Sequence, residues 1–249
     1  MRVLVTFAVD AEFAPWRKLR NFKKSKLGKA GFSGFKGNVE DNDVLVFLTG
    51  MGTKSCVDSL ARYDFGEDER PDVVISSGLA GALKEALKPG DVVVPQRNRT
   101  LNNDADATAD EHLLERAVQS GGRRIETLIT AKQLVQTAGE KNRLAFFGEA
   151  VDMESAYVMA KCVEAQIPCV TIRSVSDGFD EDLPIDFDRC LTPQGGVRPM
   201  NLLNAIVERP SGLPKLIRFG RQSNRAAHKL IEFLDSFVAT LSRVEAGIR

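Results

Sequence analysis

The sequence predicts a three-layer α/β fold, in which helices cover both faces of a central sheet. Short, nearly continuous apolar runs recur along the chain, and such runs are typical of strands buried on both faces. Segments with helical periodicity lie between these runs, and an alternation of strands and helices favours a layered architecture. A chain of 249 residues with 43% hydrophobic residues can also bury a sizeable core.

Five runs rich in β-branched and aliphatic residues, with Gly or Pro after them, predict the strands. They are VLVTFAV (3–9), VLVFLTG (44–50), DVVISSG (72–78), DVVVPQ (91–96) and CVTIRSVS (169–176). The segments between them predict helices, namely TKSCVDSLARY (53–63), DEHLLERAVQSG (110–121) and MESAYVMAKCVEAQ (153–166). The polar, acid-rich residues 101–110 are expected to form a surface loop.

The end of the chain predicts one further helix. Gly and Pro interrupt residues 191–200, and an amphipathic pattern follows within residues 218–241. Its apolar residues recur at spacings of three and four, at Leu230, Phe233, Leu234, Phe237 and Leu241. We expect this helix to pack on the sheet. Because the chain has no internal repeat and no linker, residues 1–249 are expected to form a single domain.

The charges and the N-terminus exclude several classes of protein. Lys plus Arg and Asp plus Glu are equal at 34 each, so no overall field attracts nucleic acid, and a small-molecule partner is expected. Asp10 and Glu12 interrupt the apolar core that a signal peptide needs, and no uninterrupted apolar run of about 18 residues occurs. These observations predict a cytoplasmic protein.

The few cysteines and histidines do not indicate metal or thiol chemistry. The four cysteines form no CxxC pair, and three of them lie in apolar stretches where a reduced thiol behaves as a small core residue. His112 and His228 lie in polar, helix-like segments and are expected to face solvent. Any acid–base chemistry is therefore expected to depend on carboxylates.

Two glycine turns follow predicted strands. In FLTGMGTKS, Gly50 and Gly52 precede a helix that starts at Thr53, and exposed N–H groups at a helix start favour an anion such as phosphate. A tight turn without any ligand is an equal alternative, because the third glycine of a dinucleotide motif is absent. The second turn, SSGLAGAL (76–83), contains Gly78. Ligands of open α/β sheets bind at the carboxyl ends of strands, so the two turns together indicate one crevice.

Three acids occupy similar positions. Glu12 follows the first strand, Glu154 precedes a helix, and Asp177 ends the strand that contains TIRSVSD. A carboxylate at such a place can face a crevice and gain from helix-end N–H groups. Glu154 could instead serve only the positive end of its helix, and Asp177 could be a turn or N-cap residue.

Four motifs, in this order, resemble the nucleoside phosphorylase and nucleosidase superfamily, whose members cleave N-ribosidic bonds. They are AVDAEF (8–13), TGMGTKS (49–55), SSGLAGALKEALKPGDVVVP (76–95) and AVDMESAYVMAKCVEAQIPCVTIRSVSD (150–177). The most specific part is Met153 and Glu154, followed about 20 residues later by Arg173, Ser176 and Asp177. The resemblance covers nearly the whole chain and implies a three-layer α/β/α sandwich with a central mixed sheet.

The resemblance also implies roles for these residues in an enzyme without a metal or organic cofactor. Glu154 would hold the ribose hydroxyls, Met153 would pack against the sugar, Asp177 would protonate the leaving base, and Glu12 would orient an attacking water. These residue types suit an oxocarbenium-like transition state, which needs an acid for the leaving group and a carboxylate near the sugar. Asp152 is expected to be structural. The other implied contacts are to substrate from Gly78, Ser176 and Arg173, and to phosphate or water from Gly50, Gly52 and Thr53.

The tail is similar to the hopanoid-associated branch of this superfamily, whose members are thought to remove adenine from adenosylhopane. The similar segments are SDGFDEDLP (176–184) and GGVRPMNLLNAIVERPSGLPKLIRFGRQSNRAAHKL (195–230). Basic and apolar residues alternate after residue 214, so the helix could touch an anionic membrane. A solvated basic face is an equal alternative. Relatives build pockets at dimer contacts, so a homo-oligomer is expected.

Departures from the family pattern leave the reaction open. Phosphorylases of the family carry an arginine in or near the second glycine turn, whereas VVISSGLAGAL has none, and Leu79 replaces a small polar residue. Glu12 favours water, but Arg198 or Arg173 could still hold phosphate as a co-substrate. A catalytically weak nucleoside-binding or sensing protein is the main alternative. A nicotinamide-dependent oxidoreductase would rest on the glycine turns alone.

Overall fold

A computed structural model describes residues 1–27, 32–63, 70–185 and 213–241. These residues form a 10-stranded sheet with the strand order β10-β6-β8-β9-β5-β1-β4-β3-β2, in which β7 extends β6 and β10 also pairs with β5. The strands are β1 (Arg2–Phe7), β2 (Lys23–Leu27), β3 (Phe32–Val39), β4 (Asn42–Leu48), β5 (Val73–Ala82), β6 (Val92–Thr100), β7 (Asp106–Thr108), β8 (Arg123–Thr130), β9 (Ala150–Asp152) and β10 (Cys169–Asp177).

The sheet is mixed, as the resemblance implied. Strand β1 runs parallel to β4 and β5, and β5 runs parallel to β10. Strand β10 is antiparallel to β6, after which β6, β8 and β9 run parallel to one another. Because β9 returns to pair antiparallel with β5, the strands β5, β10, β6, β8 and β9 form a closed ring. Because β1, β4, β5 and β10 run parallel to one another, the carboxyl ends of β1, β4 and β10 lie at the same edge of the sheet.

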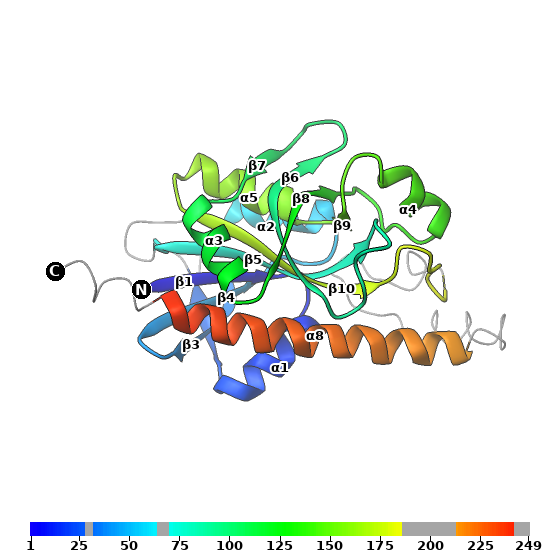
Figure 1. Ribbon diagram of the computed structural model, residues 1–249. Coiled ribbons are helices and arrows are strands. Elements are labelled where there is room, and N and C mark those ends of the chain that lie inside the picture. Colours follow the sequence, from blue (N-terminus) through cyan, green and yellow to red (C-terminus); the bar gives the residue numbers. More distant parts are fainter. Residues whose placement is uncertain (28–31, 64–69, 186–212, 242–249) are drawn as a thin grey trace.

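Helices cover both faces of the sheet. The helices α1 (Asp10–Arg20), α3 (Glu111–Gln119) and α8 (Leu213–Leu241) share one apolar cluster with β1, β5 and β10. The helices α2 (Thr53–Arg62) and α5 (Ser155–Glu164) share a second cluster with β4 and β5. Figure 1 shows α8 beside α1 below the sheet, with α2 and α5 on the opposite side. The predicted three-layer fold is confirmed, and the short helix α4 (Ala138–Leu144) lies toward one end.

The predicted elements are present with small shifts at their ends. All five predicted strands and all three predicted helices occur, although the first strand ends at Phe7 rather than at residue 9. Residues 101–110 were expected to form only a loop, but β7 lies within them because its backbone pairs with β6. Four further strands, β2, β3, β8 and β9, and the helices α1 and α4 were not predicted.

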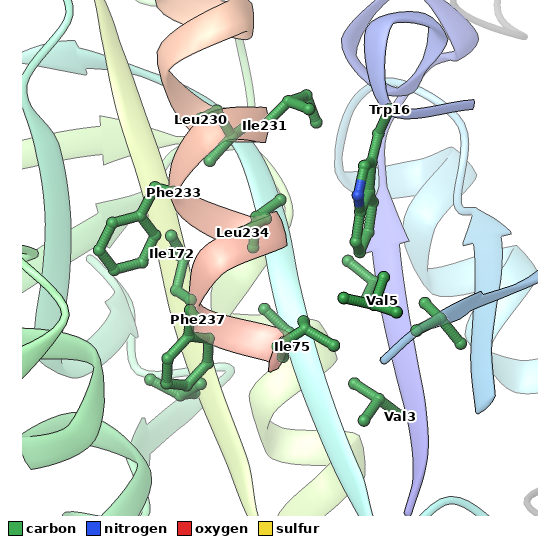
Figure 2. Close-up of a cluster of buried hydrophobic side chains, with 14 of the residues drawn as sticks. Val3, Val5, Trp16, Ile75, Ile172, Leu230, Ile231, Phe233, Leu234 and Phe237 are labelled. Atoms are coloured by element: carbon green, nitrogen blue, oxygen red, sulfur yellow. The ribbon is translucent and has the colours of Figure 1, made fainter. Parts of the chain in front are cut away.

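The C-terminal helix forms much of the core. It begins at Leu213, earlier than predicted, and its five predicted apolar residues are all buried. Figure 2 shows Leu230, Phe233, Leu234 and Phe237 against Ile172 and Ile75 of the sheet, with Trp16 of α1 nearby. Hydrogen bonds also join α8 to α1, because Asp235 accepts one from Trp16 Nε1 at 2.8 Å and one from Arg20 Nε at 2.7 Å.

The cysteines and histidines of the described residues lie where the sequence predicts them. Cys56, Cys162 and Cys169 are free and buried, as expected of core thiols, and Cys190 lies outside the described part. His112 and His228 are exposed on helices, as predicted. None of the helices in the described part of the chain combines the length and the apolar character that crossing a membrane requires.

We expect Phe237→Ala to destabilise the fold strongly. The ring is fully buried between α8 and the sheet, so its removal loses transfer free energy and leaves a cavity. The free energy of unfolding, measured by urea titration, should fall by about 3–5 kcal/mol. Ser236→Ala, at the exposed neighbouring position, is the matched control and should change it little. A loss below 1 kcal/mol (about a fivefold change in the folding equilibrium) for Phe237→Ala would contradict this packing.

Candidate active site

A cavity of about 930 Å³ lies beyond the ends of β1, β4 and β10, and α8 forms part of its wall. Five acidic residues line it, namely Asp10, Glu12, Asp152, Glu154 and Asp177, and three of these, Glu12, Glu154 and Asp177, are the predicted site acids. Its walls are otherwise largely apolar, with Leu48, Leu79, Leu134, Val135, Val151 and Phe219 among them. The two sets together make a site that can hold an apolar ligand against a few polar groups.

Glu12 is fixed by backbone N–H groups. It lies in the first turn of α1, and Oε2 accepts hydrogen bonds from the N–H groups of Ala8 at 3.1 Å and Val9 at 3.4 Å. Oε1 accepts a further bond from Leu79 N–H at 3.0 Å. Burial raises the pKa of Glu12, while the positive charge of Arg173 and these N–H donors work to lower it. A raised pKa makes this carboxylate a stronger base for a proton lost by a bound water.

Glu154 stands at the N-cap of α5, next to Met153. Its Oε1 accepts a hydrogen bond of 2.7 Å from the N–H of Gly52, which joins the first glycine turn to this helix. Burial, together with the negative charge of Asp152, raises the pKa of Glu154 to about 8. Without a ligand, Glu154 therefore carries a proton at neutral pH.

Asp152 and Arg173 form a buried ion pair beside the cavity. Arg173 Nη2 lies 2.7 Å from Asp152 Oδ2, and the side chains are 2% and 1% exposed. Arg173 Nη2 also donates to Ser155 Oγ at 2.9 Å, and Asp152 Oδ1 accepts from Thr130 Oγ1 at 2.7 Å. Because each charged group has several partners, the ion pair fixes the positions of β9, α5 and β10 relative to one another.

Asp177, at the end of β10, also pairs with a buried cation. Lys141 of α4 donates from Nζ to Asp177 Oδ2 at 2.5 Å, and the lysine side chain is 0% exposed. The hydroxyl of Ser176 lies 2.5 Å from Asp177 Oδ1. The carboxylate therefore has a partner on each oxygen while it still lines the cavity.

The glycine turns bring backbone close to these acids. Gly50 lines the cavity with a φ of 83°, which favours glycine. Gly78 has a φ of 149°, and a Cβ atom there would clash with Arg173 Nη1 and lie 3.1 Å from Glu12 Oε1. Thr53 faces the backbone instead, because its hydroxyl lies 3.3 Å from the carbonyl oxygen of Met153.

The structure brings together six of the predicted site residues. The residues that line the cavity are Glu12, Gly50, Met153, Glu154, Ser176 and Asp177. Gly52, Thr53, Gly78 and Arg173 are not among the described residues that line it. Arg173 was predicted to bind substrate, but its guanidinium is buried against Asp152. The N–H of Gly52 was predicted to bind phosphate or water, but it donates to Glu154. Arg198 lies outside the described residues.

Two features of the site were not predicted. Lys141 lies in a polar helical stretch and has the pattern of a solvent-facing lysine, so no signal in the sequence indicates its burial. The contribution of α8 to the cavity was also missed, although Phe219 interrupts a basic stretch and could have suggested an inward-facing position. Across the described residues, no group of three His, Cys, Asp or Glu side chains is placed to hold a metal ion.

A family model described as the phosphorylase superfamily matches residues 2–208. The chain belongs to this superfamily. It is similar to the 5′-methylthioadenosine/S-adenosylhomocysteine nucleosidase of Shewanella sediminis, with 30% identity over 192 residues, which cover 67% of this chain and 82% of the relative. The nucleosidase of the same description from Actinobacillus succinogenes is 30% identical over 193 residues, covering 67% of this chain and 80% of the relative.

Solved structures of the superfamily have the same fold. The nucleosidase of Neisseria meningitidis, in complex with methylthio-immucillin-A, superposes with a TM-score of 0.70 at 21% identity, over 96% of this chain and 99% of that chain. The futalosine hydrolase of Helicobacter pylori superposes with a TM-score of 0.71 at 19% identity, over 96% and 98%. The predicted nucleoside phosphorylase-like fold is therefore confirmed.

The raised pKa of Glu154 predicts a dependence of stability on pH. Between the ordinary value of 4.5 and about 8, the folded chain holds a proton that the unfolded chain has released. This contribution to the free energy of unfolding is full below about pH 4.5 and is lost as the pH rises to about 8, at most about 5 kcal/mol in total. Glu154→Gln keeps an acceptor for the N–H of Gly52 but does not titrate. The free energy of unfolding of this variant should therefore fall less between pH 4.5 and about 8 than that of the wild type.

Urea unfolding of both proteins at several pH values measures the effect as the difference between their slopes. Glu164→Gln, at the exposed end of α5, is the matched control and should keep the wild-type pH dependence. Identical slopes for the wild type and Glu154→Gln would show that Glu154 titrates normally in the folded protein.

Proposed function

We propose that this protein hydrolyses the N-glycosidic bond of an adenine nucleoside that carries an apolar group on its 5′ carbon. The observation that carries the proposal is the placement of Glu12, Glu154 and Asp177 around one largely apolar cavity. Membership of the phosphorylase superfamily and similarity to nucleosidases of methylthioadenosine support the same chemistry.

The three carboxylates supply what this reaction needs. Cleavage passes through an oxocarbenium-like state, so positive charge develops on the sugar while the base leaves with an electron pair. We assign the sugar contact to Glu154, which lines the cavity beside Met153, and this interaction strengthens as the charge grows. Asp177 faces the leaving base as the acid, and Glu12 takes the proton of the attacking water.

Water is favoured over phosphate as the nucleophile. Glu12 lines the cavity, and an ionised carboxylate there repels a phosphate dianion. Two of the groups predicted to hold phosphate already have partners, since the N–H of Gly52 donates to Glu154 and Arg173 pairs with Asp152. The absence of a metal or organic cofactor stays a prediction, as do the homo-oligomer and the cytoplasmic location.

The apolar 5′ group is supported by the cavity and by α8. About 930 Å³ is near the upper end for small-molecule sites and leaves room beyond adenine and ribose. Leu213 and Ile217 are exposed on α8, and Gly220 and Asn224 continue the same helix face at spacings of three and four and line the cavity. This helix face leads from two exposed apolar side chains to the cavity wall, and it offers an entry for a hydrocarbon chain or ring system such as that of adenosylhopane.

Asp177→Asn should abolish most adenine release. The amide cannot act as an acid, so kcat with 5′-methylthioadenosine should fall by about 10²- to 10⁴-fold, measured by chromatography of free adenine. Asp180→Asn, a substitution of the exposed aspartate in the following turn, is the matched control and should keep wild-type turnover. Unchanged activity of Asp177→Asn would remove Asp177 as the acid.

The same assay with and without phosphate separates the alternatives. Release of adenine together with free sugar at an equal rate in both buffers supports hydrolysis, whereas formation of a sugar 1-phosphate only with phosphate would show phosphorolysis. Binding of the nucleoside without release of adenine would identify a sensing or binding protein.

A lipid-linked substrate would also explain the basic surface of α8. Arg218, Arg221 and Arg225 recur at spacings of three and four, so they share one face of the helix beside the exposed Ile217. Figure 1 shows this first part of α8 (orange) at the end of the protein where α4 lies. We place a peripheral contact with an anionic membrane here, because basic residues beside apolar ones bind such surfaces.

Vesicle co-sedimentation tests the membrane contact. The protein should sediment with vesicles that contain phosphatidylserine and should do so less at high salt, because surface charge is then screened. Arg221→Glu combined with Arg225→Glu should lose most of this binding without changing turnover of 5′-methylthioadenosine. Equal sedimentation with purely zwitterionic vesicles would argue against an electrostatic contact.

A further inference from the structure

The ion pair of Asp177 creates a difficulty for its role as the acid. An acid must donate a proton, but Asp177 Oδ2 accepts a hydrogen bond from the ammonium of Lys141 at 2.5 Å, and Oδ1 accepts one from the hydroxyl of Ser176 at 2.5 Å. In the empty cavity both oxygens of Asp177 are thus acceptors. A proton has to reach it before the base can leave.

Lys141 is held in an unusual setting for a lysine. Its side chain is completely buried, and Nζ donates to Asp177 Oδ2 at 2.5 Å, to the carbonyl oxygen of Gly178 at 2.7 Å and to that of Glu181 at 2.8 Å. Three acceptors match the three protons of an ammonium group. The proton nearest the cavity is the one shared with Asp177.

Several charged groups of the described residues lie around this pair. From the turn after β10, Glu181 accepts from the N–H of Gly178, and Arg218 of α8 pairs with Glu181. Although burial works to raise it, hydrogen bonds from Gly178 and Gln222 and the charge of Arg218 lower the pKa of Glu181. The acids Glu140 and Asp182 accept hydrogen bonds at the start of α4.

We propose that Lys141 is the proton store of the site and supplies Asp177 with the proton that the leaving base receives. This inference rests on the proposed function and assigns Lys141 as a positioning residue, because it acts through Asp177. Binding of an apolar substrate closes water out of the cavity. A buried ion pair then loses the solvation that favoured separate charges, so transfer from Nζ to Oδ2 becomes accessible.

The step balances in atoms and charges. The C–N bond of the glycoside breaks and its electron pair leaves with the base, which takes a proton from Asp177 as Asp177 takes one from Lys141. The oxygen of water bonds to the sugar carbon, and the proton lost by this water goes to Glu12. After the products leave, Glu12 releases a proton to solvent and Lys141 takes one up.

Two substrates that differ in the leaving group test the proposal. Adenine needs a proton to leave, whereas 4-nitrophenolate leaves as a stable anion without one. Lys141→Met should lower kcat for 5′-methylthioadenosine by about 100-fold or more, with little change in KM. The same variant should retain turnover of the 4-nitrophenyl 5-methylthioriboside to within about threefold, because that reaction skips the acid.

Matched variants separate this role from a structural one. Arg143→Met, two residues along α4 at an exposed position, should leave both reactions unchanged. Lys141→Gln keeps hydrogen-bond donors without a transferable charge, and it should show the same selective loss if Lys141→Met does not fold. Lys141→Arg preserves the charge, but a guanidinium does not give up its proton, so it should not rescue adenine release.

The pH dependence provides a second readout. At each pH the rate for the adenine nucleoside is divided by the rate for the nitrophenyl riboside, so effects of Glu12 and of the neighbouring acids cancel. If the proton reaches Asp177 through Lys141, the pH profile of this ratio should differ between the wild type and Lys141→Met. Identical profiles in the two proteins would show that the proton does not pass through Lys141.

Three results would count against the proposal. Equal losses on both substrates would show that Lys141 only orients the site, and full activity of Lys141→Met on both would show that it is not needed. Either result leaves the proposed function intact. A wild-type protein that releases no adenine from any nucleoside would overturn the proposed function and this inference together.

Discussion

The site depends on how the fold compensates four neighbouring carboxylates that are largely removed from water. Burying an ionised carboxylate is costly unless it is paired and hydrogen-bonded. Asp152 has Arg173, Asp177 has Lys141, and Glu12 has three backbone N–H donors. Glu154 has the N–H of Gly52, and the charge of Asp152 opposes its ionisation. The four acids therefore differ in the partners that offset the cost of their burial, and these differences are clearer than those in their positions along the chain.

Incomplete compensation of Glu154 fits its place beside the sugar. With its pKa raised to about 8, this group is mostly protonated in the empty cavity at neutral pH. Positive charge that develops on a sugar beside it favours the ionised form, so the interaction grows during the reaction. A fully paired carboxylate would gain less, since its charge would already be satisfied. Among the described residues, Glu154 has one backbone N–H donor and no paired cation, which suits a group that stabilises the transition state more than the ground state.

Much of the fold follows from local pattern, whereas the site depends on distant contacts. The buried strands of the sheet and the helix with Leu230 and Phe237 are predictable because burial leaves its period in the sequence. The acids Glu154 and Asp177 are predictable from their spacing in a family motif. The burial of Lys141 is not, because its partner Asp177 is 36 residues away and its own helix is polar. The burial of Arg173 could not be predicted for the same reason, since spacing alone does not show that Asp152 pairs with it.

The two buried cations, Arg173 and Lys141, differ chemically, and this difference fits the acids with which they pair, Asp152 and Asp177. Arginine does not lose its proton in a protein, and its planar group can bind several acceptors at fixed angles. Arg173 holds Asp152 in a fixed position, which suits a residue that joins β9, α5 and β10. Lysine can lose a proton when its surroundings become dry, and Lys141 contacts the acid that lines the cavity. A lysine at this second place makes sense if the proton has to move, because a cation needed only to hold Asp177 could equally have been an arginine.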